Sequence, residues 1–157
     1  MKPKLYVETT VLNYLTARPS RDLIVAGHQQ VSQEWWERRR NGFSLFISQL
    51  VVDEAGQGDS AAVQRRLELI AGLDMLELTK EVADLASAIL KARVIPRTSA
   101  TDAAHIAVAS VHGMDSLMTW NCAHIANAEI AVAVEAVCEA QGFGCPVICT
   151  PEGLLGE

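Results

Sequence analysis

The chain has 157 residues, a formal net charge of −6 and a half-apolar composition. This length suits one compact domain, residues 1–157, with enough apolar side chains for a core. The chain contains no long uncharged apolar run and no signal-type N-terminal segment, so we expect a cytoplasmic protein with no membrane partner. The negative charge disfavours indiscriminate nucleic-acid binding, although a local site for RNA or DNA is compatible with it.

Short apolar runs rich in β-branched or aromatic residues alternate with longer helical patterns along the chain. In LYVETTVLNYL, residues 5–15, an apolar strand pattern passes directly into an apolar helical pattern. The runs that predict strands are 4–8, 43–48, 75–78, 116–120 and 146–149. The later segments that predict helices start at 20 or 22 and end before 42, and then cover 59–72, 79–95, 102–111 and about 122–141.

This alternation predicts the fold class. Strands separated by helices need crossover connections, and such connections join parallel strands. We therefore expect an α/β three-layer sandwich, in which a mostly parallel central sheet of about five strands carries helices on both faces. Open sheets of this kind bind ligands beyond the carboxyl ends of their strands.

Four oxygen-bearing side chains fall at this expected edge. Glu8 closes the first strand, Glu54 follows the second, Asp102 opens the most apolar helix and Asn121 closes the fourth strand. Carboxylates that converge repel one another unless a cation lies among them. Oxygen ligands with few histidines favour Mg²⁺ or Mn²⁺ over zinc. The joint placement predicts a divalent metal site.

Each of these residues also has a purely structural explanation. Glu8 and Glu54 could point into water. Asp102 could complete a capping box in SATD, with Ser99 as the N-cap residue. Asn121 could cap the helix that follows it.

Four segments in register carry a family resemblance. LYVETTVLNYL, FISQLVVDEAGQGD, TDAAHIAVA and LMTWNCAHI resemble, in this order and separation, the four motif blocks of the PIN-domain family, metal-dependent ribonucleases that include the toxins of VapBC-type toxin–antitoxin pairs. The similarity covers essentially the whole chain. It implies that Glu8, Glu54, Asp102 and Asn121 occupy the metal-binding positions. It also implies that Thr10 supplies the hydroxyl that steadies the first acid or a metal-bound water.

The resemblance implies an endoribonuclease that uses Mg²⁺ or Mn²⁺ and hydrolyses a phosphodiester with metal-activated water, the toxin of a type II pair with an antitoxin partner and a homodimeric state. Two positions depart from the family pattern, since Glu8 stands where Asp is usual and Asn121 is a neutral amide. A shift of the metal by about one methylene can cost on the order of 10²-fold in rate. The alternative is a catalytically silent PIN-like module that binds RNA or a protein partner.

Other residues suggest rival sites. His105 shares a helix face with Asp102, and is either a hydrogen-bonded core group or an aid to substrate binding. The four cysteines, with His124, could hold structural zinc, but no C-x-x-C pair is present, and we expect Cys145 and Cys149 to pack as small hydrophobes.

Trp35 and Trp36 lie beside a basic run and could stack on bases. Helical spacing favours instead one ring in the core and the other at a subunit contact. The sequence lacks the phosphate-loop, zinc-protease, serine-hydrolase and dinucleotide-binding motifs.

Overall fold

A five-stranded parallel sheet forms the centre of the computed structural model, which describes residues 1–156. The strand order is β3-β2-β1-β4-β5. The strands are β1 (Lys4–Val7), β2 (Ser44–Ser48), β3 (Asp74–Leu76), β4 (Ser116–Met118) and β5 (Val147–Cys149). Strand β1 lies in the middle, with Leu5 opposite both Leu45 and Ser116. The predicted parallel arrangement is confirmed, and each predicted strand is present.

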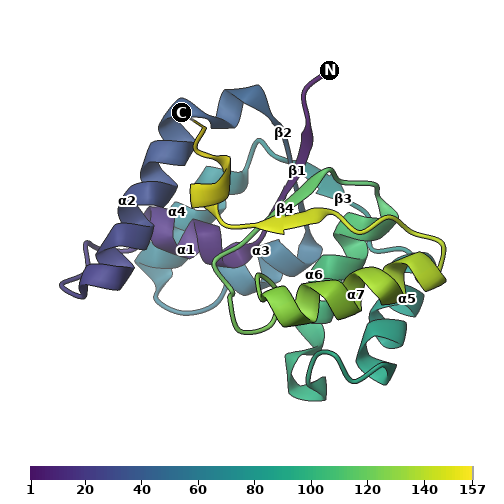
Figure 1. Cartoon of the computed structure of the whole chain (residues 1–157). Coiled ribbons are helices and arrows are strands. Elements are labelled where there is room, and N and C mark those ends of the chain that lie inside the picture. The colour runs from purple at the N-terminus through teal and green to yellow at the C-terminus, as the bar shows by residue number, and fades with distance from the viewer. Residues whose placement is uncertain (157) are drawn as a thin grey trace.

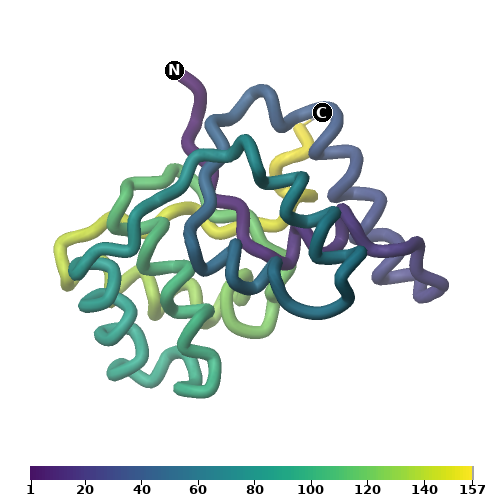
Figure 2. The backbone as a smooth tube through the Cα atoms, turned by 180° about the vertical axis from the view of Figure 1, so that it is seen from behind, coloured from purple at the N-terminus to yellow at the C-terminus, as the bar shows by residue number. Residues whose placement is uncertain are grey.

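Helices cover both faces of this sheet. They are α1 (Thr9–Thr16), α2 (Leu23–Arg38), α3 (Gln49–Ala55), α4 (Ser60–Ile70), α5 (Lys80–Lys91), α6 (Ala100–Val111) and α7 (Ala128–Ala140), with short 3₁₀ turns η1 (Arg40–Gly42), η2 (Arg97–Ser99) and η3 (Pro151–Leu154). Figure 1 and the reverse view in Figure 2 show α1, α2 and α4 gathered on one side of the sheet, and α5, α6 and α7 on the other. This is the predicted three-layer sandwich. Within residues 1–156 no helix has the length and apolar character needed to cross a bilayer.

The central strand is buried because both of its faces are covered. Leu5, Tyr6 and Val7 have no exposed surface, as expected for a parallel strand with helices on either side. Helix α6 is buried almost all round, including the continuous stretch 105–110. A polar side chain in either element must therefore find its hydrogen-bond partner inside the protein.

Side-chain caps fix where several helices begin. Asp22 accepts hydrogen bonds from the backbone N–H groups of Ile24 and Val25 at 3.0 Å. Asp59 and Thr79 cap α4 and α5 in the same way. These three residues are the N-caps that the sequence predicts, because a short polar side chain satisfies the free N–H groups of a first turn.

The predicted start of the last helix is wrong. Helix α7 begins at Ala128 rather than near Cys122, because Asn127 caps it by accepting from the N–H groups of Glu129 and Ile130. The residues before it form a turn, closed by the backbone carbonyl of Asn121, which accepts from the N–H groups of residues 125 and 126.

The start of α6 is also shifted, from the predicted Asp102 to Ala100. The predicted capping box is not formed, because Ser99 makes no side-chain capping bond. The carboxylate of Asp102 lies instead against a residue far along the chain, as described below.

Candidate active site

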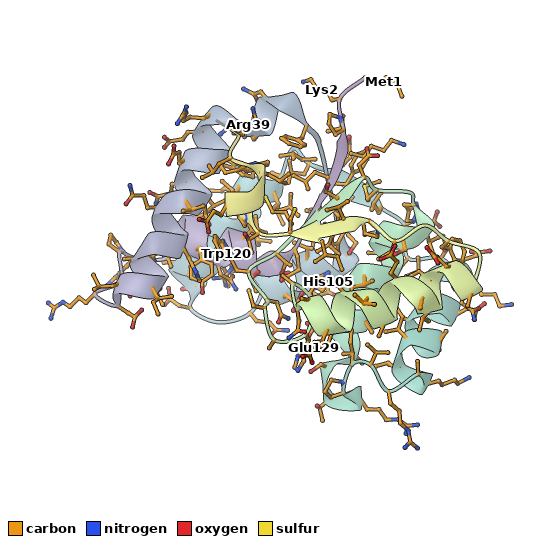
Figure 3. All side chains as sticks on the ribbon, viewed as in Figure 1. Met1, Lys2, Arg39, His105, Trp120 and Glu129 are labelled. Atoms are coloured by element: carbon orange, nitrogen blue, oxygen red, sulfur yellow. The ribbon has the colours of Figure 1, made fainter. Side chains whose placement is uncertain are left out.

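The carboxyl ends of three neighbouring strands bring polar residues to one edge of the sheet. Glu8 follows β1, Ser48 ends β2 and Thr119 follows β4. Since β1 lies between β2 and β4, these residues are neighbours in space. Figure 3 shows His105 at this end of the molecule, away from Lys2 at the amino end of the sheet.

Glu8 is a buried carboxylate surrounded by hydrogen-bond donors. Its side chain caps α1, with Oε2 accepting from the Thr10 N–H at 2.7 Å. Its Oε1 accepts from the hydroxyls of Thr10, at 2.9 Å, and Thr119, at 2.7 Å. Both hydroxyls accept a backbone N–H, from Trp120 and Asn121 respectively, so their own protons are available to Glu8. Glu8 is only 3% exposed, and a polar side chain buried to this degree needs such partners.

Glu54, near the end of α3, lies beside Glu8 through the first turn of α1. Its Oε1 accepts from the Thr9 hydroxyl at 2.8 Å and from His105 Nε2 at 2.5 Å. Partial burial raises the pKa of Glu54, but the hydrogen bond and charge of His105 and the bond from Thr9 outweigh it, and the pKa lies below its usual value. Glu54 is therefore a carboxylate at neutral pH.

Tyr6 lies near both glutamates. Burial raises the pKa of Tyr6; a hydrogen bond with Ser48 opposes this rise, and the negative charges of Glu8 and Glu54 add to it. The phenol therefore stays protonated and available as a donor at the carboxyl end of β1.

The other two candidate residues meet through His124. Asp102 Oδ2 lies 3.1 Å from His124 Nδ1, and Asn121 Oδ1 accepts from the His124 backbone N–H at 3.1 Å. The side chains of Asp102 and His124 are 19% and 31% exposed. Asn121 therefore caps a turn and not the following helix, so its predicted structural role is wrong in this respect, and Asn127 caps α7 instead.

Hydrogen bonds link Glu8, Asn121 and Asp102, whereas Glu54 bonds separately to Thr9 and His105, and the carboxylates do not converge directly. Within residues 1–156, no three His, Cys, Asp or Glu side chains form a metal-ligating group. Glu8, Glu54 and Asp102 each face donors rather than one another, as like charges favour. A backbone-to-hydroxyl bond from Asn121 to Thr119 continues to Glu8 and joins the two halves.

The donor set nevertheless fits a divalent cation. It consists of carboxylate and amide oxygens, the ligands that Mg²⁺ and Mn²⁺ prefer. No Lys or Arg of the described chain forms an ion pair with Glu8, Glu54 or Asp102. Burying an ionised carboxylate without a compensating charge is costly. This cost is greatest at Glu8, which is the most buried of the three carboxylates.

A family model of the PIN domain matches residues 5–121, about three quarters of the chain. The chain belongs to the PIN-domain family. The match begins in β1 and ends at Asn121, so all four candidate residues lie inside it. PIN domains are typically nucleases, and they generally use divalent metal ions. A comparison with curated protein sequences found no match.

The sequence analysis did not predict the contacts that three polar residues of this PIN domain make at the site. Thr9 and Thr119 donate to the two glutamates, and His124 bridges Asp102 and Asn121. Thr119 and His124 flank Asn121 in the TWNCAH segment, but neighbouring in sequence does not reveal their partners. Thr10, expected to steady the first acid, donates to Glu8 through both its backbone N–H and its hydroxyl.

His105 is a hydrogen-bonded core group, which is the first of its two predicted roles. It is fully buried and both of its ring nitrogens are hydrogen-bonded, as in a core histidine. One of these partners is Glu54, so the buried ring also contacts the candidate site. Asp102, which lies on the same helix as His105, bonds to a different histidine, His124.

Trp36, the less buried of the two neighbouring tryptophans, lies away from the candidate site. Trp35 is fully buried, and Trp36 is half-buried beneath the Arg40 guanidinium, which lies 5.2 Å from the ring centroid. Trp36 and Arg40 line a cavity of about 510 Å³ near Lys2, at the amino end of the sheet. The cysteines are exposed at 122, buried at 138 and half-buried at 145 and 149.

Proposed function

We propose that this PIN domain is an endoribonuclease that depends on Mg²⁺ or Mn²⁺. The observation that carries the proposal is the buried Glu8 carboxylate, which accepts three hydrogen bonds at the sheet edge and has no cationic side chain paired with it among residues 1–156. Glu54 lies next to it, held by Thr9 and His105. A fold built only for stability gains nothing from burying such a charge.

Glu8, Glu54, Asp102 and Asn121 would hold the ion, and Thr10 would orient Glu8. When bound, the cation supplies an activated water and stabilises charge on the phosphoryl oxygens. Glu8 is nearly inaccessible, whereas the side chains of Glu54 and Asp102 are 36% and 19% exposed. We therefore expect the RNA phosphate to approach across Glu54 and Asp102, with Glu8 beneath.

The two departures from the family pattern bear on the rate. The longer arm of Glu8 folds back to cap its own helix. The amide oxygen of Asn121 accepts from a backbone N–H and carries no charge, so a second cation would be held more weakly than the first. We expect slow hydrolysis that proceeds with one cation.

The biological role that we propose is that of a VapC-like toxin, which cuts cytoplasmic RNA, is neutralised by an antitoxin protein and acts as a homodimer. The support is the family membership. The net charge of −6 requires RNA to be recognised locally. A small DNA-binding reading frame next to the gene, growth arrest on expression, and a dimer in light scattering are the expected observations.

RNA cleavage with and without Mn²⁺ tests the nuclease proposal. Labelled RNA is incubated with the wild type, Asp102→Asn and the control Asp84→Asn, which changes an exposed carboxylate on α5. We expect Mn²⁺-dependent cleavage that EDTA abolishes, retained by Asp84→Asn and reduced roughly 100-fold by Asp102→Asn, as for a misplaced catalytic group. Equal RNA stability in all lanes, insensitive to EDTA, would overturn the proposal.

A silent PIN-like module is the second candidate. It is favoured by the hydrogen bonds that already occupy both oxygens of Glu8, and by the separation of the carboxylates within the described residues. Such a module would bind RNA or a protein partner, seen as a mobility shift in a native gel. It would not cleave RNA in the presence of Mn²⁺. Cleavage by the wild type that Asp102→Asn lacks would exclude it.

A further inference from the structure

A continuous line of buried polar side chains leads from the second strand to Glu54. Ser48 Oγ lies 2.8 Å from the Tyr6 hydroxyl, and that hydroxyl lies 2.7 Å from His105 Nδ1. His105 Nε2 then reaches Glu54 Oε1. We call Ser48, Tyr6 and His105 the buried relay. It connects β2, β1 and α6 to α3.

The relay lies in the apolar core, although Glu54 itself is at the surface. Ser48, Tyr6 and His105 have no exposed surface, whereas the Glu54 side chain is 36% exposed. The His105 ring reaches from α6 to Tyr6 of β1 and to Glu54 of α3, so it points into the protein rather than outward. Polar groups buried at this depth must be fully paired to be tolerated. The relay meets this condition by ending on the Glu54 carboxylate.

The bond to Glu54 fixes one end of the relay. An ionised carboxylate can only accept, so the Nε2–H of His105 donates to Glu54. The opposite ring nitrogen, Nδ1, hydrogen-bonds the Tyr6 hydroxyl, which in turn hydrogen-bonds the Ser48 hydroxyl. With both nitrogens bonded in this way, the orientation of the imidazole is fixed.

Glu54 is thereby held by a single oxygen. Oε1 accepts from both Thr9 and His105, which approach from different elements. Oε2 accepts no hydrogen bond from residues 1–156 and remains available to a cation. Partners of this kind orient metal-ligating groups and tune their affinity.

We propose that His105, oriented by Tyr6 and Ser48, is a positioning residue that holds Glu54 ready to bind the divalent cation. This inference rests on the proposed function. It differs from a purely structural role, in which loss of the relay would change only the free energy of unfolding. It also gives Tyr6, a strand residue with no access to solvent, a role in orienting His105.

Mn²⁺ affinity, measured by titration calorimetry or electron paramagnetic resonance on the full chain, tests the inference without depending on activity. His105→Leu should weaken Mn²⁺ binding about 10- to 100-fold, the loss typical of outer partners of a ligand. His105→Gln should restore part of it, since its amide can donate in place of Nε2–H. Tyr6→Phe should weaken binding less than His105→Leu, and Tyr14→Phe, a matched change whose hydroxyl lies outside the relay, should match the wild type.

The outcomes separate this inference from the proposed function. A wild type that binds no Mn²⁺ overturns both. A wild type and a folded His105→Leu or Tyr6→Phe of equal Mn²⁺ affinity overturn the relay and leave the nuclease proposal standing. Tyr6→Phe decides the matter if His105→Leu does not fold, because it removes one oxygen and keeps the ring. On RNA, we expect His105→Gln and Tyr6→Phe to raise the Mn²⁺ concentration needed for half-maximal rate.

Discussion

Two imidazole–carboxylate pairs lie at the carboxyl edge of the sheet, and they differ in burial and support. In the first, His105 is 0% exposed and its partner Glu54 is 36% exposed; in the second, His124 is 31% exposed and Asp102 is 19% exposed. The separations are 2.5 Å and 3.1 Å. The buried ring uses both nitrogens, one toward Tyr6 and one toward Glu54. The side chain of His124 makes its hydrogen bond through Nδ1, and its ring lies on a turn.

This difference indicates which half of the site is rigid. A buried, fully paired network is held in one arrangement, because any other would leave a polar group unsatisfied. A half-exposed pair competes with water and gains little. We therefore expect Glu54 to keep its position when the cation is absent, and Asp102 and His124 to adjust when it binds.

The largest expected effect comes from removing the carboxylate of the rigid pair. Glu54→Gln should lower Mn²⁺-dependent RNA cleavage by at least about 100-fold, as for displacement of a catalytic group. Asp53→Asn is the matched control, since Asp53 is the exposed neighbour that hydrogen-bonds Gln49. Initial rates at saturating Mn²⁺ measure both, and equal losses in the two variants would contradict a specific role for Glu54.

An intermediate effect is expected on stability from the buried ring. His105→Leu should lower the free energy of unfolding by about 1–3 kcal/mol, because it leaves the buried Tyr6 hydroxyl without its hydrogen-bond partner on α6. Urea denaturation without metal measures this. An unchanged midpoint and slope would mean that the relay does not stabilise the fold, and would weaken the contrast with the second pair.

The smallest effect should come from the exposed ring. His124→Ala should change the free energy of unfolding by no more than about 0.5 kcal/mol, as is usual for surface substitutions. The same urea titration applies. A loss of unfolding free energy as large as that of His105→Leu would show that both histidines stabilise the fold equally, although only His105 is buried.

The sheet was predictable because its strands carry apolar, β-branched and aromatic runs separated by helix caps such as Asp22, Asp59 and Thr79. The start of α7 was not, because Asn121 and Asn127 are equally good caps and the residues between them, AHIA among them, fit a helical pattern. Only the tertiary structure shows that the first closes a turn and the second begins the helix.

The location of the candidate site was predictable from the sequence, but the hydrogen-bond partners of its acids were not. Parallel topology alone places Glu8 and Asn121 at one edge. The partners of the acids depend instead on how helices pack across the sheet. Tyr6 and His105, for example, are 99 positions apart and meet only because α6 packs close to β1. No local pattern distinguishes a histidine that orients an acid from one that merely fills the core.

Residues 122–156, which follow the span matched by the family model, complete the edge of the sheet. Strand β5 pairs with β4 through Leu117 and Ile148, and the Arg39 Nε–H donates to the carbonyl of Leu154 at 3.2 Å, tying η3 to the end of α2. Without residues 122–156, β4 would become an edge strand whose free backbone N–H and C=O groups could pair with other chains. We therefore expect a chain cut after Asn121 to expose the backbone of β4 and to be prone to aggregate.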